Sequence, residues 1–150
     1  MSHRWWIWPL CEALHFIGMA MLVGIVGVID LRMLGMAKGL PIGPLQRLRP
    51  WAVLGFAINL ATGVSFIALN PRQYLGPPLS LTLVAKMLFI ALAGANAILF
   101  YVTGLGRLVD DVEAGHEAPR GAKVSAAVSL LLWVAVMYWG RMLQLFGKSF

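Results

Sequence analysis

Four long apolar segments constrain the fold of this chain more than any other feature. They are Leu10–Leu31, Trp51–Leu69, Leu79–Tyr101 and Val124–Met142. At about 1.5 Å per residue, each helix would extend roughly 28–35 Å, which matches the hydrocarbon core of a bilayer. Because backbone polar groups must be paired inside lipid, each segment is predicted to be a helix. The sequence therefore predicts an all-α integral membrane four-helix bundle, with residues 1–150 forming one domain.

The composition agrees with a membrane protein and excludes several other classes. The chain is 60% hydrophobic and 12% charged, whereas soluble domains are about a quarter charged. The net charge of +6 does not indicate nucleic-acid binding, because the basic residues lie mostly in short linkers between apolar segments. The single cysteine, Cys11, excludes a disulfide within the chain and a c-type haem attachment motif.

The distribution of basic residues predicts an orientation in the membrane. The first and third linkers lie on one side and hold seven basic residues: Arg32, Lys38, Arg47, Arg49, Arg107, Arg120 and Lys123. The other side holds four: Arg4, Arg72, Arg141 and Lys148. By the positive-inside rule, we expect both linkers in the cytoplasm and both termini in the periplasm of a bacterial inner membrane.

The first apolar segment contains the most informative residues. His15 is the one histidine that lies inside an apolar segment; Glu12 precedes it by three residues, Cys11 precedes it by four, and Met19 follows it by four. On a helix these spacings place all four side chains on one side. An ionisable residue within a membrane span is energetically costly, so His15 marks a candidate functional site.

Residues of other spans are expected at the same depth as His15. Lys86 lies seven residues after the start of the third span, which runs parallel to the first, and Arg141 ends the fourth span on the same side. We therefore expect Glu12, His15, Lys86 and Arg141 to converge on one pocket. A structural alternative is that Lys86 and Arg141 extend to the interface, Glu12 neutralises one of them, and His15 is only hydrogen-bonded.

Small and polar residues elsewhere favour helix packing. Gly55, Asn59 and Gly63 recur every fourth residue on the second span, and Thr62 and Phe66 continue the stripe. Small residues allow close approach of helices in membranes, and asparagine can hydrogen-bond between them. Asp30 and Arg32 are expected to form an ion pair at the cytoplasmic end of the first span.

Three cofactors are candidates for this pocket: a b-type haem, Cu(I) and a di-iron centre. A b-type haem needs an axial imidazole, an apolar slot and cations for its propionates. His15 would be the metal ligand, Gly18, Ala93 and Ala97 would line the slot, and Arg141, Arg72 and Lys86 would meet the propionates. Met19 shares a helix with His15 and cannot lie across the ring from it, so a sixth ligand would be Lys86, Met87 or Met137.

The two other chemistries have less support in the sequence. Cys11, His15 and Met19 offer soft ligands that suit Cu(I). A di-iron site would need a second Glu-x-x-His motif and further carboxylates, and the second, third and fourth spans contain none.

Two motifs carry a resemblance to known families. Glu12-Ala-Leu-His15-Phe-Ile-Gly-Met-Ala-Met-Leu-Val-Gly, followed by Asp30-Leu-Arg-Met-Leu-Gly35, resembles a family of uncharacterised four-helix bacterial membrane proteins. More remotely, Ala-Leu-His15 and Leu83-Val-Ala-Lys86-Met-Leu resemble HemJ-type protoporphyrinogen oxidases and CopD-like membrane domains. The resemblance implies haem b, with His15 and Lys86 as the functional pair. A second histidine of the oxidases falls near Asn96 here, which is a departure.

These observations predict a membrane protein that binds haem b through His15 and has a redox or electron-transfer accessory role. The competing hypothesis is a non-catalytic subunit of a larger membrane complex, with Glu12, His15 and Lys86 as a buried polar network. Enzymatic activity is left open. Besides the lipid bilayer, the expected partner is a second copy of the chain or a larger complex, because the apolar surface is large for 150 residues.

Overall fold

The computed structural model describes residues 5–77 and 79–148. Four long helices dominate the described part of the chain: α1 (Ile7–Met33), α3 (Arg49–Leu69), α5 (Leu79–Val102) and α7 (Arg120–Lys148). Three short helices lie in the linkers: α2 (Ile42–Gln46), α4 (Pro71–Leu75) and α6 (Leu105–Asp110). The prediction of an all-α four-helix bundle is confirmed.

The four long helices are apolar and long enough to cross a membrane. Large apolar side chains on their outer faces are exposed, among them Ile17, Leu60, Leu88 and Leu131, as expected where lipid and not water is the surrounding medium. The chain thus has the structure of a multi-pass membrane protein. Three of the predicted segments differ from the observed helices by at most three residues at either end, whereas α7 extends the fourth from 124–142 to 120–148.

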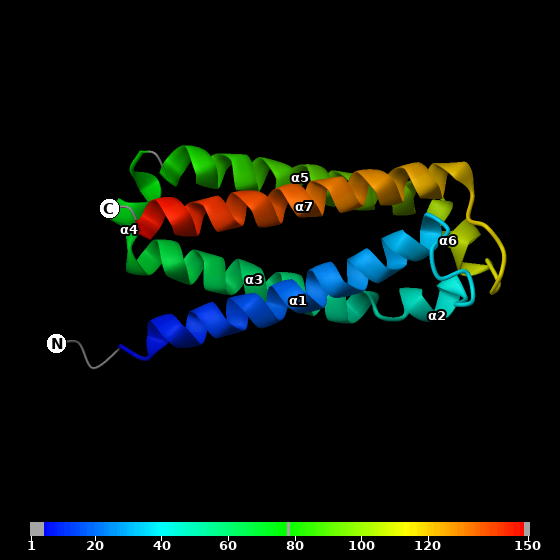
Figure 1. The fold of residues 1–150 in the computed structure, drawn as a ribbon, viewed down its shortest axis with the longest axis horizontal. Coiled ribbons are helices and arrows are strands. Elements are labelled where there is room, and N and C mark those ends of the chain that lie inside the picture. The colour runs from blue at the N-terminus through cyan, green and yellow to red at the C-terminus, as the bar shows by residue number, and fades with distance from the viewer. Residues whose placement is uncertain (1–4, 78, 149–150) are drawn as a thin grey trace.

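The long helices are arranged as two close pairs. α1 packs on α3, α5 packs on α7, and contacts between α1 and α7 join the pairs. Figure 1 shows the pairs as two layers that approach each other at the end where α2 and α6 lie. The first and third linkers lie at this end, which we call the linker end. α1 begins and α7 ends at the opposite end, which we call the terminal end.

Two glycines allow α1 and α3 to approach closely. A Cβ atom on Gly55 would lie 2.7 Å from the carbonyl oxygen of Gly18, and one on Gly18 would lie 2.8 Å from the carbonyl oxygen of Gly55. Both positions must therefore lack a side chain. The predicted packing role of Gly55 is confirmed, but the Asn59 amide donates to the Gly55 carbonyl of its own helix at 2.9 Å and not across the interface.

The two layers meet in a hydrophobic core at the linker end. Buried members include Ile29 and Met33 of α1, Ile42 of α2, Phe100 of α5 and Val109 of α6. Three alanines complete the cluster: Ala118 just before α7, and Ala122 and Ala126 within it. This core holds the two helix pairs together at the linker end. It does not fill the space between the pairs nearer the terminal end.

Arg32 ties the first and third linkers together beside this core. Its side chain is 1% exposed, and its guanidinium donates to the carbonyls of Leu40, Glu113 and His116. The predicted Asp30–Arg32 ion pair is therefore wrong. The two side chains are two residues apart on a helix and diverge. The loop carbonyls accept from Nε and Nη2 of Arg32 instead, and the buried Nη1 has no hydrogen-bond partner.

An exposed ion cluster lies over the same linkers. The carboxylate of Glu117 accepts from Lys38 at 2.9 Å and from Lys123 at 3.2 Å. These hydrogen bonds, first that of Lys38 and then that of Lys123, lower the pKa of Glu117 below its usual value. Because Glu117 is exposed, the cluster contributes little to stability, but it links α7 to the first linker.

Candidate functional site

A cavity of about 490 Å³ lies between the helix pairs in the half of the molecule near the terminal end. Its lining comes from all four long helices and from α4. All five of the predicted site residues line it: Glu12, His15 and Met19 from α1, Lys86 from α5 and Arg141 from α7. We call it the outer cavity. Its volume falls within the range of about 300–1,000 Å³ typical of ligand sites.

His15 is held by a hydrogen bond to the neighbouring helix. Its Nδ1 lies 2.7 Å from the Thr62 hydroxyl oxygen. That hydroxyl has one proton, and it lies 2.7 Å from the carbonyl oxygen of Ile58 and 3.2 Å from that of Asn59, to which it donates. We therefore assign Thr62 as the acceptor from His15, with the imidazole proton on Nδ1. Nε2 then carries a free lone pair that can accept a proton or bind a metal.

Two residues of α3 fix the position of the His15 ring. The ring of Phe66 meets it edge-on with 5.5 Å between centroids, and Phe66 also packs on Trp8 at 4.9 Å. Gly63 lies beside the imidazole, and a Cβ there would meet His15 Cε1 at 4.0 Å, an ordinary van der Waals distance. The imidazole is thus restrained by packing as well as by Thr62.

Lys86 reaches the cavity from the opposite helix pair. Its Nζ lies 3.5 Å from the position that a Cβ of Gly140 would occupy, so the ammonium lies over a glycine of α7. Within the described residues, the ion pairs are confined to the Glu117 cluster. Neither Glu12 nor any other described carboxylate neutralises Lys86, which differs from the structural alternative considered above.

The other two charged residues of the outer cavity are exposed, whereas Asn59 of α3 lines it as a buried polar residue. Glu12 and Arg141 are exposed, and Arg141 donates to the side chain of Gln144 at 3.0 Å. Tyr74 of α4 also lines the cavity. Burial, and to a lesser extent the negative charge of Glu12, raises the pKa of the Tyr74 phenol, so this group remains a neutral hydrogen-bond donor at physiological pH.

The predicted apolar slot is not formed by one set of residues. Gly18 is buried against α3 and serves the helix contact. Ala93 and Ala97 line a second cavity of about 310 Å³ in the half near the linker end. Of the proposed sixth ligands, Lys86 and Met87 line the outer cavity. Arg72 is exposed on α4 and lies outside the lining.

A site made only of classical metal-ligating residues is not present in the described part of the chain. No group of three or more histidine, cysteine, aspartate or glutamate side chains is close enough there to hold a metal ion. Cys11 is half-buried but does not line the outer cavity with His15 and Met19. The three proposed Cu(I) ligands therefore do not share this cavity.

Four residues of the site were not predicted from the sequence: Thr62, Phe66, Tyr74 and Gly140. Thr62 and Phe66 are four residues apart on α3, on either side of Gly63, and this spacing places them on one helix face. The second span packs against the helix that carries His15, so a polar and an aromatic residue on either side of a glycine there could have indicated contacts to the histidine.

Comparisons with known proteins gave no matching family model, no similar curated protein and no similar solved structure.

Proposed function

We propose that this chain is a bacterial inner-membrane protein that binds a b-type haem in the outer cavity, with His15 as axial ligand. The hydrogen bond from His15 Nδ1 to Thr62 is the observation that carries the proposal. Metal-ligating histidines regularly donate their other ring proton to a fixed acceptor, which sets the tautomer and the ring orientation. Thr62 supplies that acceptor, and Nε2 is left as the ligand atom.

The rest of the cavity fits a large apolar molecule with anionic substituents. Apolar side chains of four helices form most of the lining, and Lys86 and Arg141 add two cations from α5 and α7. Lys86 lacks an ion-pair partner among the described residues, so an anionic propionate would stabilise a charge that is otherwise left unpaired. Haem supplies one-electron redox chemistry when it is bound.

The residues of this chain would hold and orient such a group. Thr62 and Phe66 keep the imidazole plane in place, and Lys86 attracts an anionic group from the opposite side of the cavity. Lys86 or Met87 is available as a sixth ligand. We place this site in the periplasmic half of the membrane, and we assign the chain a redox accessory role with a partner protein or a second copy of itself.

Absorption spectroscopy of the purified protein tests the proposal. Protein produced in haem-replete cells should show a Soret band, and His15→Ala should lose at least nine-tenths of it because no other described histidine lines the cavity. His116→Ala is the matched control, since His116 is exposed in the third linker, and it should retain the full band. Lys86→Met should retain haem but shift its reduction potential, because a cation is lost from a site of low dielectric constant.

The competing proposal gives a different set of spectra. If Glu12, His15 and Lys86 are only a polar network of a non-catalytic subunit, the wild-type protein will carry no pigment. A Soret band that survives in His15→Ala would also contradict the axial assignment. The absence of an ion pair between Glu12 and Lys86 in the described structure favours the haem proposal over this network.

A further inference from the structure

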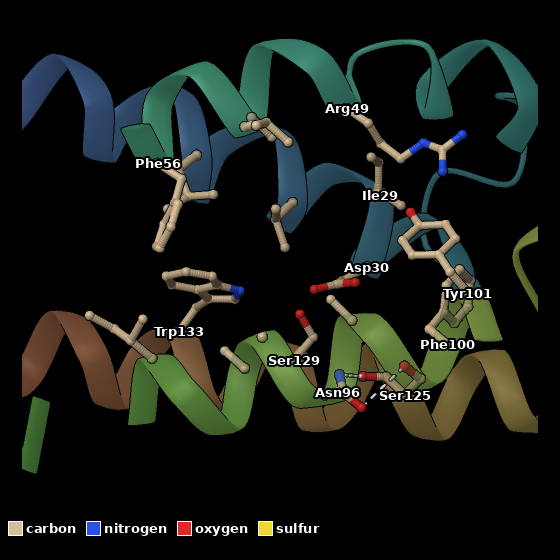
Figure 2. Close-up of a pocket in the computed structure, with 18 of the residues that line it drawn as sticks. Ile29, Asp30, Arg49, Phe56, Asn96, Phe100, Tyr101, Ser125, Ser129 and Trp133 are labelled. Carbon is tan, nitrogen blue, oxygen red and sulfur yellow. Dashed lines mark hydrogen bonds between the residues drawn. The ribbon is translucent and has the colours of Figure 1, made fainter. Parts of the chain in front are cut away.

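The second cavity, which we call the inner cavity, lies between the same helix pairs toward the linker end. It has a volume of about 310 Å³ and is bounded by residues of α1, α3, α5 and α7. Leu22, Phe56, Ile90 and Trp133 line both cavities, so the two cavities adjoin at these residues. The rings of Phe56, Phe100 and Trp133 contribute to its predominantly apolar wall (Figure 2).

Asp30 is the polar feature of this cavity that needs an explanation. The residue is 5% exposed, lines the inner cavity, and its Oδ2 has no hydrogen-bond partner. Figure 2 shows the carboxyl group pointing from α1 across the cavity toward Ser129 of α7. An unsatisfied buried polar atom is energetically unfavourable, and more so when it is charged, so a donor from outside the chain would be strongly favoured there.

Arg49, Asn96 and Ser125 also line the cavity, but their donors are engaged elsewhere. Arg49 donates to the carbonyl of Gln46 at 3.0 Å and lies over the ring of Tyr101. The Asn96 amide donates to the carbonyl of Ser125 at 3.0 Å, and the Ser125 hydroxyl donates back to the Asn96 side chain at 3.3 Å. The hydroxyl of Ser129 interacts with the carboxyl group but leaves Oδ2 unpaired.

We infer that the inner cavity binds an apolar molecule that carries a neutral hydroxyl group, which donates to Oδ2 of Asp30. The apolar wall accommodates the body of the molecule, and the single unsatisfied oxygen selects the donor. A carboxylate repels an anionic ligand, and Arg49, which also lines the cavity, disfavours a cationic one. A lipophilic hydroquinone and a long-chain alcohol share the required chemistry.

Thermal unfolding of the full chain in mild detergent, titrated with four probes, tests this inference. The probes are 2-decylhydroquinone, its dimethyl ether, 1-dodecanol and the methyl ether of dodecanol. A ligand that binds the native state raises the unfolding temperature in a saturable manner. Each ether partitions into detergent much like its parent but has no O–H, so we expect each hydroxyl compound that binds to do so about tenfold or more tightly than its ether. Binding of only the hydroquinone identifies an aromatic ligand, and binding of dodecanol identifies an aliphatic one.

Variants of Asp30 complete the test. Asp30→Leu removes the acceptor and should abolish the difference between hydroxyl compound and ether, while Asp111→Asn, an exposed carboxyl in the third linker, should leave it unchanged. If Asp30→Leu shows no cooperative transition, Asp30→Asn replaces it and should reduce the difference. Equal binding of hydroxyl compounds and ethers, or no effect of either Asp30 variant, would overturn the inference and leave Asp30 as a protonated structural group.

Discussion

Single residues decide which chemistry the outer cavity can perform, and the pair formed by His15 and Thr62 is the clearest case. The Thr62 hydroxyl donates to the Ile58 carbonyl of its own helix and accepts from the imidazole. The same oxygen therefore makes a hydrogen bond within α3 and sets the histidine tautomer. A threonine in a packing stripe thereby acquires a role in positioning the candidate ligand atom on α1.

We predict that Thr62→Val weakens haem binding without abolishing it. The variant keeps the shape of the side chain but leaves the Nδ1 proton of His15 without an acceptor, and loss of such a supporting group typically lowers metal affinity about 10–100-fold. Thr62→Ser retains the hydroxyl and should bind haem nearly as well as the wild type. Haem titration of the apoprotein provides the measurement, and equal affinities for Val and wild type would contradict the assigned tautomer.

The sequence was informative about the residues of the site but not about their supports. Depth along the spans was enough to predict that His15, Lys86 and Arg141 lie near one another, because parallel helices in a bilayer share a common vertical scale. The rotation of each helix about its axis is not specified by depth. For that reason Gly63 and Gly140, which lie beside His15 and Lys86, were not assigned to the site in advance.

At the scale of the helices, close contact between α1 and α3 depends on two backbone surfaces that touch. We predict that Gly55→Ala lowers the midpoint of thermal unfolding in detergent, since the new Cβ would lie 2.7 Å from the Gly18 carbonyl and 3.0 Å from the Leu22 nitrogen. These are backbone atoms that cannot move aside independently, and overpacking of this kind typically destabilises by about 1–3 kcal/mol.

Gly94→Ala is the matched control for this prediction. Gly94 lies on α5, and a Cβ there would meet nothing within 4 Å. Because alanine favours a helix more than glycine does, this variant should unfold at or slightly above the temperature of the wild type. Unfolding of Gly55→Ala at the same temperature as Gly94→Ala would show that the α1–α3 contact is looser than the structure indicates.

The existence and the approximate bounds of the four long helices could be predicted from the apolar segments of the sequence. The end of α1 has a local cause, because Gly35 adopts a positive φ of 101°, a conformation that terminates helices and is readily adopted by glycine. The extension of α7 to residues 120–148 was not predicted, since hydropathy does not distinguish a helix that ends at the interface from one that continues into water.

For the whole molecule, the structure confirms that the first and third linkers share one end, whereas the side of the membrane that each end faces remains a prediction from charge. We expect the linker end in the cytoplasm. In a Cys11→Ser background, an impermeant maleimide added to intact spheroplasts should label Arg72→Cys but label Arg107→Cys only after permeabilisation. Labelling in the reverse order would invert the orientation and move the outer cavity to the cytoplasmic half.

The contacts of Arg32 set an order of events during biosynthesis. Its partners Glu113 and His116 follow it by 81 and 84 residues, so they leave the ribosome long after α1 is complete. Until then the Leu40 carbonyl is the one of its three acceptors already synthesised, and the rest of the guanidinium can be satisfied only by water, by lipid headgroups or by the insertion machinery. The contacts of Arg32 at the linker end therefore cannot be completed before the third linker has been synthesised, and a nascent chain arrested before residue 113 would keep the linker end of α1 free to tilt or rotate.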